Sequence, residues 1–212
     1  MGLFSFLSKN TPAYTVSDKI WVSQEESLRG IGTEALTAIT RGEIPIILSF
    51  FEDSQKQVLA YLQHQQAPVV EMVPSNANQV PAKTIICLDA WLAVHSLTHS
   101  TLDKTKITFL LYGHYPLIAP EDTLLNELHQ LTGTPKFTSF FSLDHPLMAV
   151  FGSDQMKSLM LKMGIKKDEC IQHSMVSRSV VRARQKISES VKQEFETTSE
   201  IEWYVKNIRK PS

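Results

Sequence analysis

The 212-residue sequence has few of the residues on which disulfide-bonded and metal-binding folds depend. It contains only two cysteines, Cys87 and Cys170. Two cysteines are too few for a secreted disulfide framework, and their separation matches no metal or redox spacing. A reducing, cytoplasmic setting is therefore expected, with Cys87 buried as a small apolar side chain within an apolar run.

Glycine is also scarce, and the eight glycines form neither of the usual phosphate-binding loops. No Gly-x-x-x-x-Gly-Lys-Ser/Thr sequence and no Gly-x-Gly-x-x-Gly turn occurs. Asp89 ends an apolar strand as a Walker B acid would, but without a phosphate loop a helix cap explains it better. We therefore predict no nucleotide cofactor and no catalytic residue.

The sequence has no excess of positive charge and no long apolar segment. Its net charge is −1, which gives no electrostatic footprint for nucleic acid. The first ten residues lack the basic region of a signal peptide, and no run is long enough for a membrane span. Hydrophobic residues make up 42% and charged residues 20%, which is the composition of a globular protein able to bury a full core.

Two short patterns, one of histidines and one around a serine, resemble sites but lack the residues that such sites need. His95 and His99 stand four residues apart, as zinc ligands on a helix would, but no third ligand is evident. Two surface histidines are the favoured interpretation. Ser153 and Asp154 follow Gly152 without the Gly-x-Ser-x-Gly elbow of a nucleophile, so a turn at the start of a helix explains them. We predict no metal site.

The body of the chain alternates short apolar runs with amphipathic segments. Strands are expected at 19–23, 44–51, 69–73, 84–89 and 107–112, and helices at 24–41, 53–66, 90–97 and 121–131. Alternation of this kind predicts a mostly parallel sheet with helices on both faces, linked by right-handed crossovers. The predicted α/β domain spans residues 14–146 and follows an N-terminal arm at 1–13.

From residue 147 to residue 212 the pattern is helical only. One helix is expected over 147–163. A longer one begins near Ser174, which is expected to cap it. Its apolar stripe is predicted to be core or a docking face rather than a free coiled coil. The stripe consists of Val176, Val180, Ala183, Ile187, Val191 and Phe195. The last segment carries Trp203 and Tyr204 and is expected to fold back onto the body.

Three segments of the second half resemble SecA, the ATPase of bacterial preprotein translocation. They are FFSLDHPLMAVFGSD at 140–154, LMLKMGIK at 159–166 and ECIQHSMVSRSVVRARQK at 169–186. They resemble the junction between the second nucleotide-binding domain of SecA, which is RecA-like, and its helical scaffold. More loosely, 18–27 and 42–49 resemble the first strands of that domain. The resemblance implies a RecA-like fold over most of this chain, corresponding to a minor part of a SecA.

The same resemblance implies that the ATPase motifs have been lost. SecA carries a Gly-Arg-Gly-Thr-Asp loop where this sequence has residues 92–96. It also carries arginines that reach ATP phosphates where this sequence has His129, Leu131 and Thr134. Neutral leucine and threonine cannot replace a charged bidentate fork. An arginine on a transferring phosphate is worth a factor of about 10³ or more.

Two functions follow as hypotheses. The first is a non-catalytic SecA-like interaction or regulatory module that docks on a P-loop ATPase, on a translocase component such as SecA, or on a second copy of itself. The second is a nucleotide- or small-ligand-binding protein that uses a remodelled crevice at the carboxyl ends of the strands. The residues expected near that crevice are Asp89, His95, Tyr112, His114 and Tyr115.

Overall fold

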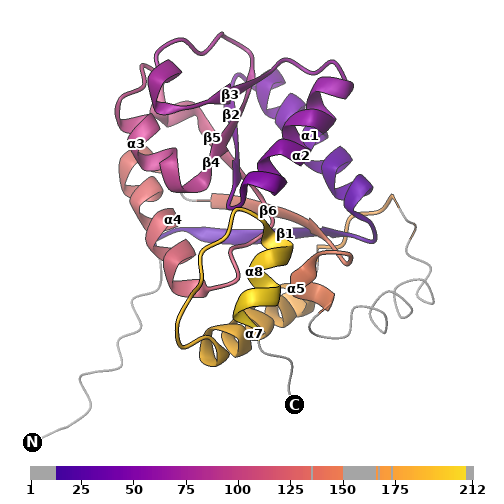
Figure 1. The fold of residues 1–212 in the computed structure, drawn as a ribbon. Helices are drawn as coiled ribbons and strands as arrows, with labels where there is room; N and C mark the ends of the chain where they lie inside the picture. Colours follow the sequence, from indigo (N-terminus) through magenta and orange to yellow (C-terminus); the bar gives the residue numbers. More distant parts are fainter. Residues whose placement is uncertain (1–12, 135, 150–165, 167, 173, 209–212) are drawn as a thin grey trace, which may run out of the picture.

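The fold is built around one fully parallel, six-stranded sheet (Figure 1). The computed structural model describes residues 13–134, 136–149, 166, 168–172 and 174–208. The strand order is β1-β6-β5-β2-β4-β3, and every neighbouring pair is parallel. The strands are β1 (Thr15–Trp21), β2 (Ile44–Ser49), β3 (Val69–Met72), β4 (Ile85–Asp89), β5 (Ile107–Tyr112) and β6 (Lys136–Ser142).

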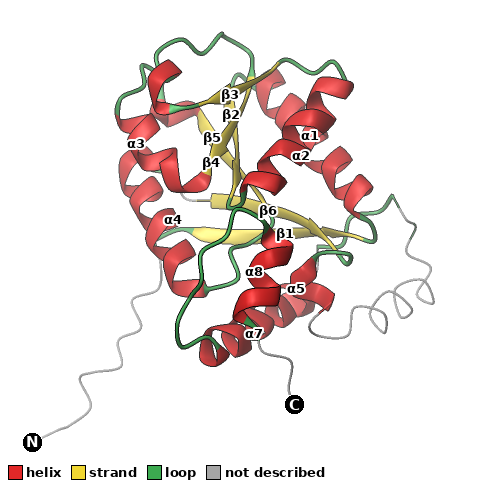
Figure 2. Ribbon diagram, in the orientation of Figure 1, coloured by secondary structure: helices red, strands yellow, loops and turns green. Residues whose placement is uncertain are grey.

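Helices cover both faces of this sheet, as Figure 2 shows. Those of the α/β body are α1 (Gln24–Thr40), α2 (Glu52–His64), α3 (Ala93–Thr98) and α4 (Ile118–Thr132). Helices α1 and α2 share one apolar layer with Ile47, Cys87 and Leu110. Helices α3 and α4 lie on the opposite layer with Ile46 and Leu48. The predicted α/β class, with a parallel sheet covered on both faces, is confirmed.

Three further helices gather beside β1 and β6 at one end of the molecule (Figure 1). They are α5 (Pro146–Ala149), α7 (Ser174–Ser190) and α8 (Glu200–Asn207). Val180, Ala183 and Ile187 of α7 are buried in the main core, as the stripe predicted. Trp203 of α8 is fully buried, so the last segment folds back onto the body as expected. A boundary between residues 146 and 147 stays a prediction.

The stripe of α7 does not extend to Phe195. Helix α7 ends at Ser190, and the Phe195 side chain is 54% exposed. Its backbone N–H instead donates to Oδ1 of Asn207 in α8, at 2.7 Å. A side-chain amide therefore fixes this loop, which a helical periodicity could not anticipate.

Strand β6 is an element that the periodicity missed. The last four residues of the strand, Ser139–Ser142, are all buried, so the strand shows no alternation of apolar and polar positions. A strand covered on both faces loses that alternation, and a short run of this kind resembles a buried helix segment. Strand β1 also begins earlier than expected, at Thr15 rather than residue 19.

Several helix boundaries differ from the prediction. Helix α4 begins at Ile118 instead of Glu121. Residues 90–97 form a short 3₁₀ turn (Ala90–Leu92) and then α3. Ser174 is the first residue of α7 rather than its cap. The predicted N-terminal arm and the segment Gly152, Ser153 and Asp154 lie outside the described residues, as does the expected helix beyond residue 149.

Helix α2 spans Glu52–His64 rather than the predicted 53–66, and a distant segment closes its amino end. The helix begins at Glu52 after Phe51, and neither Asp53 nor Ser54 precedes it as a cap. The carbonyl oxygen of Thr198 takes that place and accepts hydrogen bonds from the N–H groups of Glu52 (3.0 Å) and Asp53 (3.4 Å). A segment distant in sequence satisfies the open N–H groups of this helix.

Candidate functional site

A cavity of about 690 Å³ opens at the carboxyl edge of the sheet. Strands β2, β3, β4 and β5 all end beside it, and the loop between α7 and α8 forms its far wall. Ligands of α/β sheets bind at this edge, and the volume lies within the usual range for small-molecule sites. The lining residues are Phe50, Phe51, Glu52, Gln55, Glu71, Met72, Val73, Asp89, Trp91, Leu92, Tyr115, Pro120, Glu194, Glu196, Thr197 and Thr198.

Aromatic rings form one wall of the cavity. Trp91 and Tyr115 meet edge to face, with ring centroids 4.8 Å apart, and Phe50 lies within 6 Å of both. The indole Nε1–H of Trp91 donates to the carbonyl oxygen of Phe50, at 3.1 Å, which fixes the ring. Phe50 and Tyr115 are almost fully buried, whereas Trp91 is 42% exposed. The accessible aromatic surface of this wall therefore belongs mainly to Trp91.

Five carboxylates line the same cavity, and they come from four separate parts of the fold. Glu52 begins α2, Glu71 lies in β3 and Asp89 ends β4, while Glu194 and Glu196 belong to the loop before α8. None of the described residues that line the cavity is a lysine, arginine or histidine. The cavity therefore has a negative potential, which favours cations and opposes phosphate groups.

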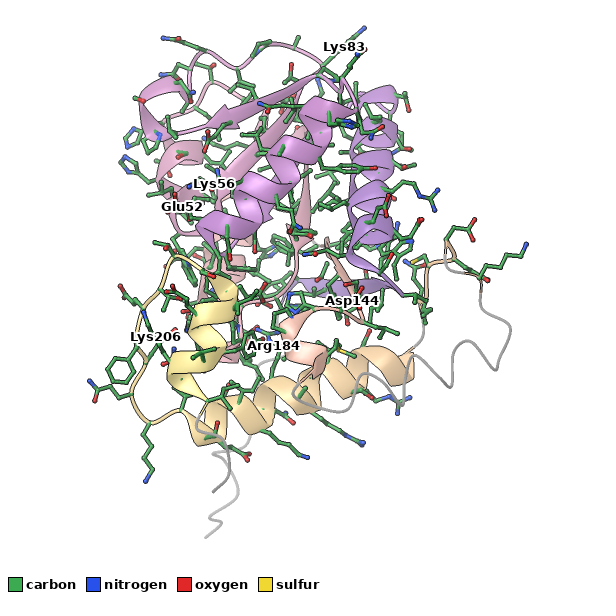
Figure 3. The ribbon with its side chains drawn as sticks, turned by 45° about the vertical axis from the view of Figure 1, so that its right-hand side comes forward. Glu52, Lys56, Lys83, Asp144, Arg184 and Lys206 are labelled. Atoms are coloured by element: carbon green, nitrogen blue, oxygen red, sulfur yellow. The ribbon has the colours of Figure 1, made fainter. Side chains whose placement is uncertain are left out.

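Most of these carboxylates are held by neutral donors. Gln55 Nε2 donates to Glu71 Oε1 at 3.0 Å, and the backbone N–H of Trp91 donates to Asp89 Oδ1 at 2.8 Å. Burial raises the pKa of Asp89, and the nearby charge of Glu52 raises it further. Glu52 forms an ion pair with Lys56 one turn along α2, and Figure 3 labels both side chains.

Glu194 ties the loop to the body. Its Oε1 accepts a hydrogen bond from the hydroxyl of Tyr115 and another from the indole Nε1–H of Trp203, at 2.6 Å. Asp53 adds a second tie, because its carboxylate accepts from Ser199 Oγ at 2.8 Å and from the N–H of Glu200. The loop that closes the cavity is therefore fixed at both ends.

Behind the cavity, a buried ionic network joins the sheet to α7. His114, which follows β5, places Nε2 2.8 Å from Asp18 Oδ1 and Nδ1 2.9 Å from Glu121 Oε1. Arg184 rises from α7 toward the sheet (Figure 3) and lies 3.0 Å from the same Glu121 oxygen. It also donates to the carbonyl oxygens of Tyr115 (2.9 Å) and Leu117 (3.3 Å). All four charged side chains are buried.

These contacts fix the charge state of the network. Burial and the charge of Arg184 both lower the pKa of His114, but the charge of Glu121 and the hydrogen bonds to Asp18 and Glu121 outweigh them and raise that pKa to about 9. Burial would raise the pKa of Glu121, yet the charges of His114 and Arg184 hold it below its usual range. The pKa of Asp18 is lowered in the same way by His114. At neutral pH the network therefore contains two anions and two cations.

The structure brings together only some of the residues predicted for the crevice. Asp89 and Tyr115 line the cavity, and Asp89 also caps the following 3₁₀ turn as expected. Tyr112 packs on the layer of α1 and α2 and donates to Gln57 Oε1 at 3.1 Å. His114 is buried in the ionic network. His95 is exposed on α3, with its ring centroid 4.7 Å from that of His99.

Sequence reasoning missed most of the cavity wall. Glu71 lies within a short strand, and Glu194 and Glu196 follow a helix more than a hundred residues later. No local pattern joins these positions. The sequence contains one indication of these residues. Ligands of α/β sheets bind at the carboxyl ends of the parallel strands, and Glu71 and Asp89 lie near the ends of neighbouring strands. Trp91 follows Asp89 by two residues, so the same reasoning could have predicted it as part of the wall.

The three positions at which the SecA resemblance implies arginines in that family lie elsewhere. His129, Leu131 and Thr134 are at the carboxyl end of α4, near the start of β5. His129 Nδ1 lies 2.8 Å from the carbonyl oxygen of Thr134. The Thr134 hydroxyl donates to the carbonyl oxygen of Ile107 at 3.3 Å. They therefore border the amino edge of the sheet, opposite the acidic cavity.

Neither cysteine forms a disulfide, and Cys87 is buried as predicted. Burial raises the pKa of the Cys87 thiol to about 12, so it is not a reactive thiolate. Across the described ranges, no three His, Cys, Asp or Glu side chains are grouped to hold a metal ion. No helix within those ranges has the length and apolar character needed to cross a bilayer.

Known proteins resemble this chain over a limited segment. No family model matches it. A stretch of 56 residues is 46% identical to the protein translocase subunit SecA of Ehrlichia chaffeensis, and a stretch of 59 residues is 48% identical to that of Cytophaga hutchinsonii. The chain contains a SecA-like segment. These matches cover 26% and 27% of this chain but only 6% and 5% of the respective SecA subunits.

Two solved structures, each 10% identical to this chain, are also similar. One is the C-terminal domain of a possible DNA helicase from Lactobacillus plantarum. Its TM-score is 0.43, and the match covers 61% of this chain and 73% of that chain. The other is the C-terminal part of the Fun30 ATPase domain, with a TM-score of 0.40 over 77% of this chain and 54% of that chain. Scores this low support no functional conclusion, so the link to SecA rests on sequence.

Proposed function

We propose that the chain is a non-catalytic, SecA-like module that docks on a P-loop ATPase of preprotein translocation in a reducing, cytoplasmic compartment. The SecA-like segment supports the link to translocation. The single observation that carries the non-catalytic part is the acidic lining of the cavity at the carboxyl edge of the sheet. That edge is where an α/β domain would hold a nucleotide.

The lining opposes the binding of ATP on electrostatic grounds. Phosphate groups are usually bound by arginine, lysine, open backbone N–H groups or a metal ion. The described cavity wall has no basic side chain, and the first N–H groups of α2 already donate to the carbonyl oxygen of Thr198. Five carboxylates line the space that the phosphate chain would occupy. The same surface suits a protein partner, because charge complementarity favours association with a basic patch.

Affinity purification from the native host, followed by mass spectrometry, tests this function. The tagged chain is expected to enrich a P-loop ATPase or another export component above an untagged control. Capture of an untagged copy of the same chain without an ATPase would point to self-association and contradict docking on an ATPase. Repeated purifications without any ATPase or secretion component would also contradict the proposal.

A second candidate function is the binding of a small molecule in the cavity, and the volume of about 690 Å³ favours it. The acidic wall restricts this candidate to ligands that are neutral or positively charged. A thermal-shift panel that contains ATP, ADP, GTP and polyamines distinguishes the possibilities. Stabilisation by a nucleotide would support the original crevice hypothesis, whereas stabilisation by polyamines alone would support a cation site.

A further inference from the structure

The described lining of the cavity carries five acidic side chains and no basic one. Within the part of the chain that the structure describes, only Glu52 of these five carboxylates forms an ion pair with a basic side chain, that of Lys56. Glu71, Asp89 and Glu194 are held by an amide, a backbone N–H and two neutral side chains respectively. Like charges gathered around one partly enclosed space repel each other, since the interior screens them less than bulk water does. A cation placed among them would relieve that repulsion.

The aromatic wall of the cavity also favours a particular kind of ligand. Trp91 presents its ring beside the acids, and it is fixed there by its hydrogen bond to the Phe50 carbonyl oxygen. Among aromatic side chains, tryptophan gives the strongest cation–π attraction. Leu92 and Met72 line the same cavity and supply apolar surface. A ligand with a cationic head and an apolar stem would use the carboxylates, the indole face and this surface together.

We infer that the cavity is a binding site for an organic cation with an aliphatic stem, and that this cation is the lysine or arginine side chain of the partner protein. The inference rests on the proposed docking function and names the chemistry of its contact. The cavity holds the end of one long side chain, and the rim residues meet the backbone around it. A free polyamine shares the chemistry of the side chain and is the alternative source.

Calorimetric titration of the full chain with small probes tests the inference. The probes are acetyl-Gly-Arg-Gly-amide, acetyl-Gly-Lys-Gly-amide, the matched norleucine peptide and spermidine. The variant Glu71→Gln with Asp89→Asn removes two charges and keeps hydrogen-bond acceptors for Gln55 and for the Trp91 N–H. A matched control, Asp103→Asn with Glu127→Gln, removes two exposed charges that do not line the cavity. Thermal unfolding of both variants confirms that they fold.

Saturable binding of a basic peptide, weakened about tenfold or more in the cavity variant and unchanged in the control, would support the inference. The norleucine peptide carries no positive charge. Its affinity for the unmodified chain is expected to be no higher than the affinity of the basic peptides for the cavity variant. If spermidine binds and neither basic peptide does, the cavity is a cation site, but its ligand is not a side chain of a protein partner. No binding by any cation, or equal loss in both variants, would overturn the site itself.

Failure of this inference is distinguishable from failure of the proposed function. If the cavity variant still captures the translocation partner from the native host, the proposed docking is supported. In that case the cation site is not the contact through which the chain docks. If cations bind but no ATPase or export component is captured, the cation site stands and the proposed function is wrong.

Discussion

At the scale of single residues, His114 joins parts of the chain that are far apart in sequence. Its two ring nitrogens contact Asp18 in β1 and Glu121 in α4, and Arg184 of α7 shares the Glu121 carboxylate. A doubly protonated imidazole donates through both nitrogens, so the charged ring satisfies both acids. Each charge in the network is compensated by a neighbour, which a buried charge requires if it is not to destabilise the fold.

The stability of the chain is therefore expected to fall as pH rises from about 6.5 to about 9. The pKa of His114 is raised from 6.5 to about 9, so its contribution is fully present below pH 6.5 and is lost as pH rises through the folded value. A shift of this size corresponds to on the order of 3 kcal/mol. Denaturant unfolding across pH 5.5 to 10 measures it.

His114→Gln provides the comparison for that titration. The difference in free energy of unfolding between the unmodified chain and the variant is expected to shrink across the alkaline range. A difference that stays constant with pH would contradict a charged His114. Below about pH 4.5 the unmodified chain also loses stability, because the pKa values of Asp18 and Glu121 are lowered in its folded state.

Arg184 provides a second prediction at the residue scale. Arg184→Met keeps much of the side-chain volume but leaves Glu121 buried without its guanidinium partner. Breaking a buried pair from one side typically costs about 3–5 kcal/mol. Denaturant unfolding is expected to show a loss in that range, and adding Glu121→Gln is expected to recover part of it. A loss below about 1 kcal/mol would show that the network does not hold α7 on the body.

At the scale of elements, α1 depends on a close approach to the strand before it. A Cβ at Gly30 would lie 2.2–2.9 Å from three ring atoms of Trp21. The indole cannot yield easily, because Trp21 is itself buried and stacks on Phe140, with centroids 5.7 Å apart. Helix propensity favours alanine here, and packing opposes it.

Gly30→Ala is therefore expected to lower the free energy of unfolding by about 1–3 kcal/mol, despite the better helix propensity of alanine. Gly32→Ala is the matched control on the same helix. Its Cβ would meet the end of the flexible Leu62 side chain at 3.2 Å, so a smaller loss is expected. Thermal unfolding of the two variants compares them, and equal stability would contradict the role of the Trp21 contact.

At the scale of the whole molecule, the sequence predicted the architecture and the carboxyl edge of the sheet as a crevice, but only part of the cavity wall. The alternation of apolar runs with amphipathic helices gave the parallel sheet, and the α7 stripe correctly predicted Val180 and Ile187 as core. Strand β6 was not predicted, because burial on both faces removes the alternation of apolar and polar residues along it. The acidic wall of the cavity was not predicted, because Glu71 and Glu194 come to line one cavity only through tertiary folding, when the loop before α8 crosses the ends of the strands.

We propose above all that this chain, which contains a SecA-like segment, presents an acidic cavity at the edge of the sheet where a nucleotide would otherwise bind. Calorimetric titration of the full chain with Mg-ATP at physiological salt tests it most directly. We predict no saturable heat up to millimolar nucleotide, because the carboxylates of the cavity face the phosphates without a basic side chain among its described lining. Stoichiometric binding with micromolar affinity would contradict the account.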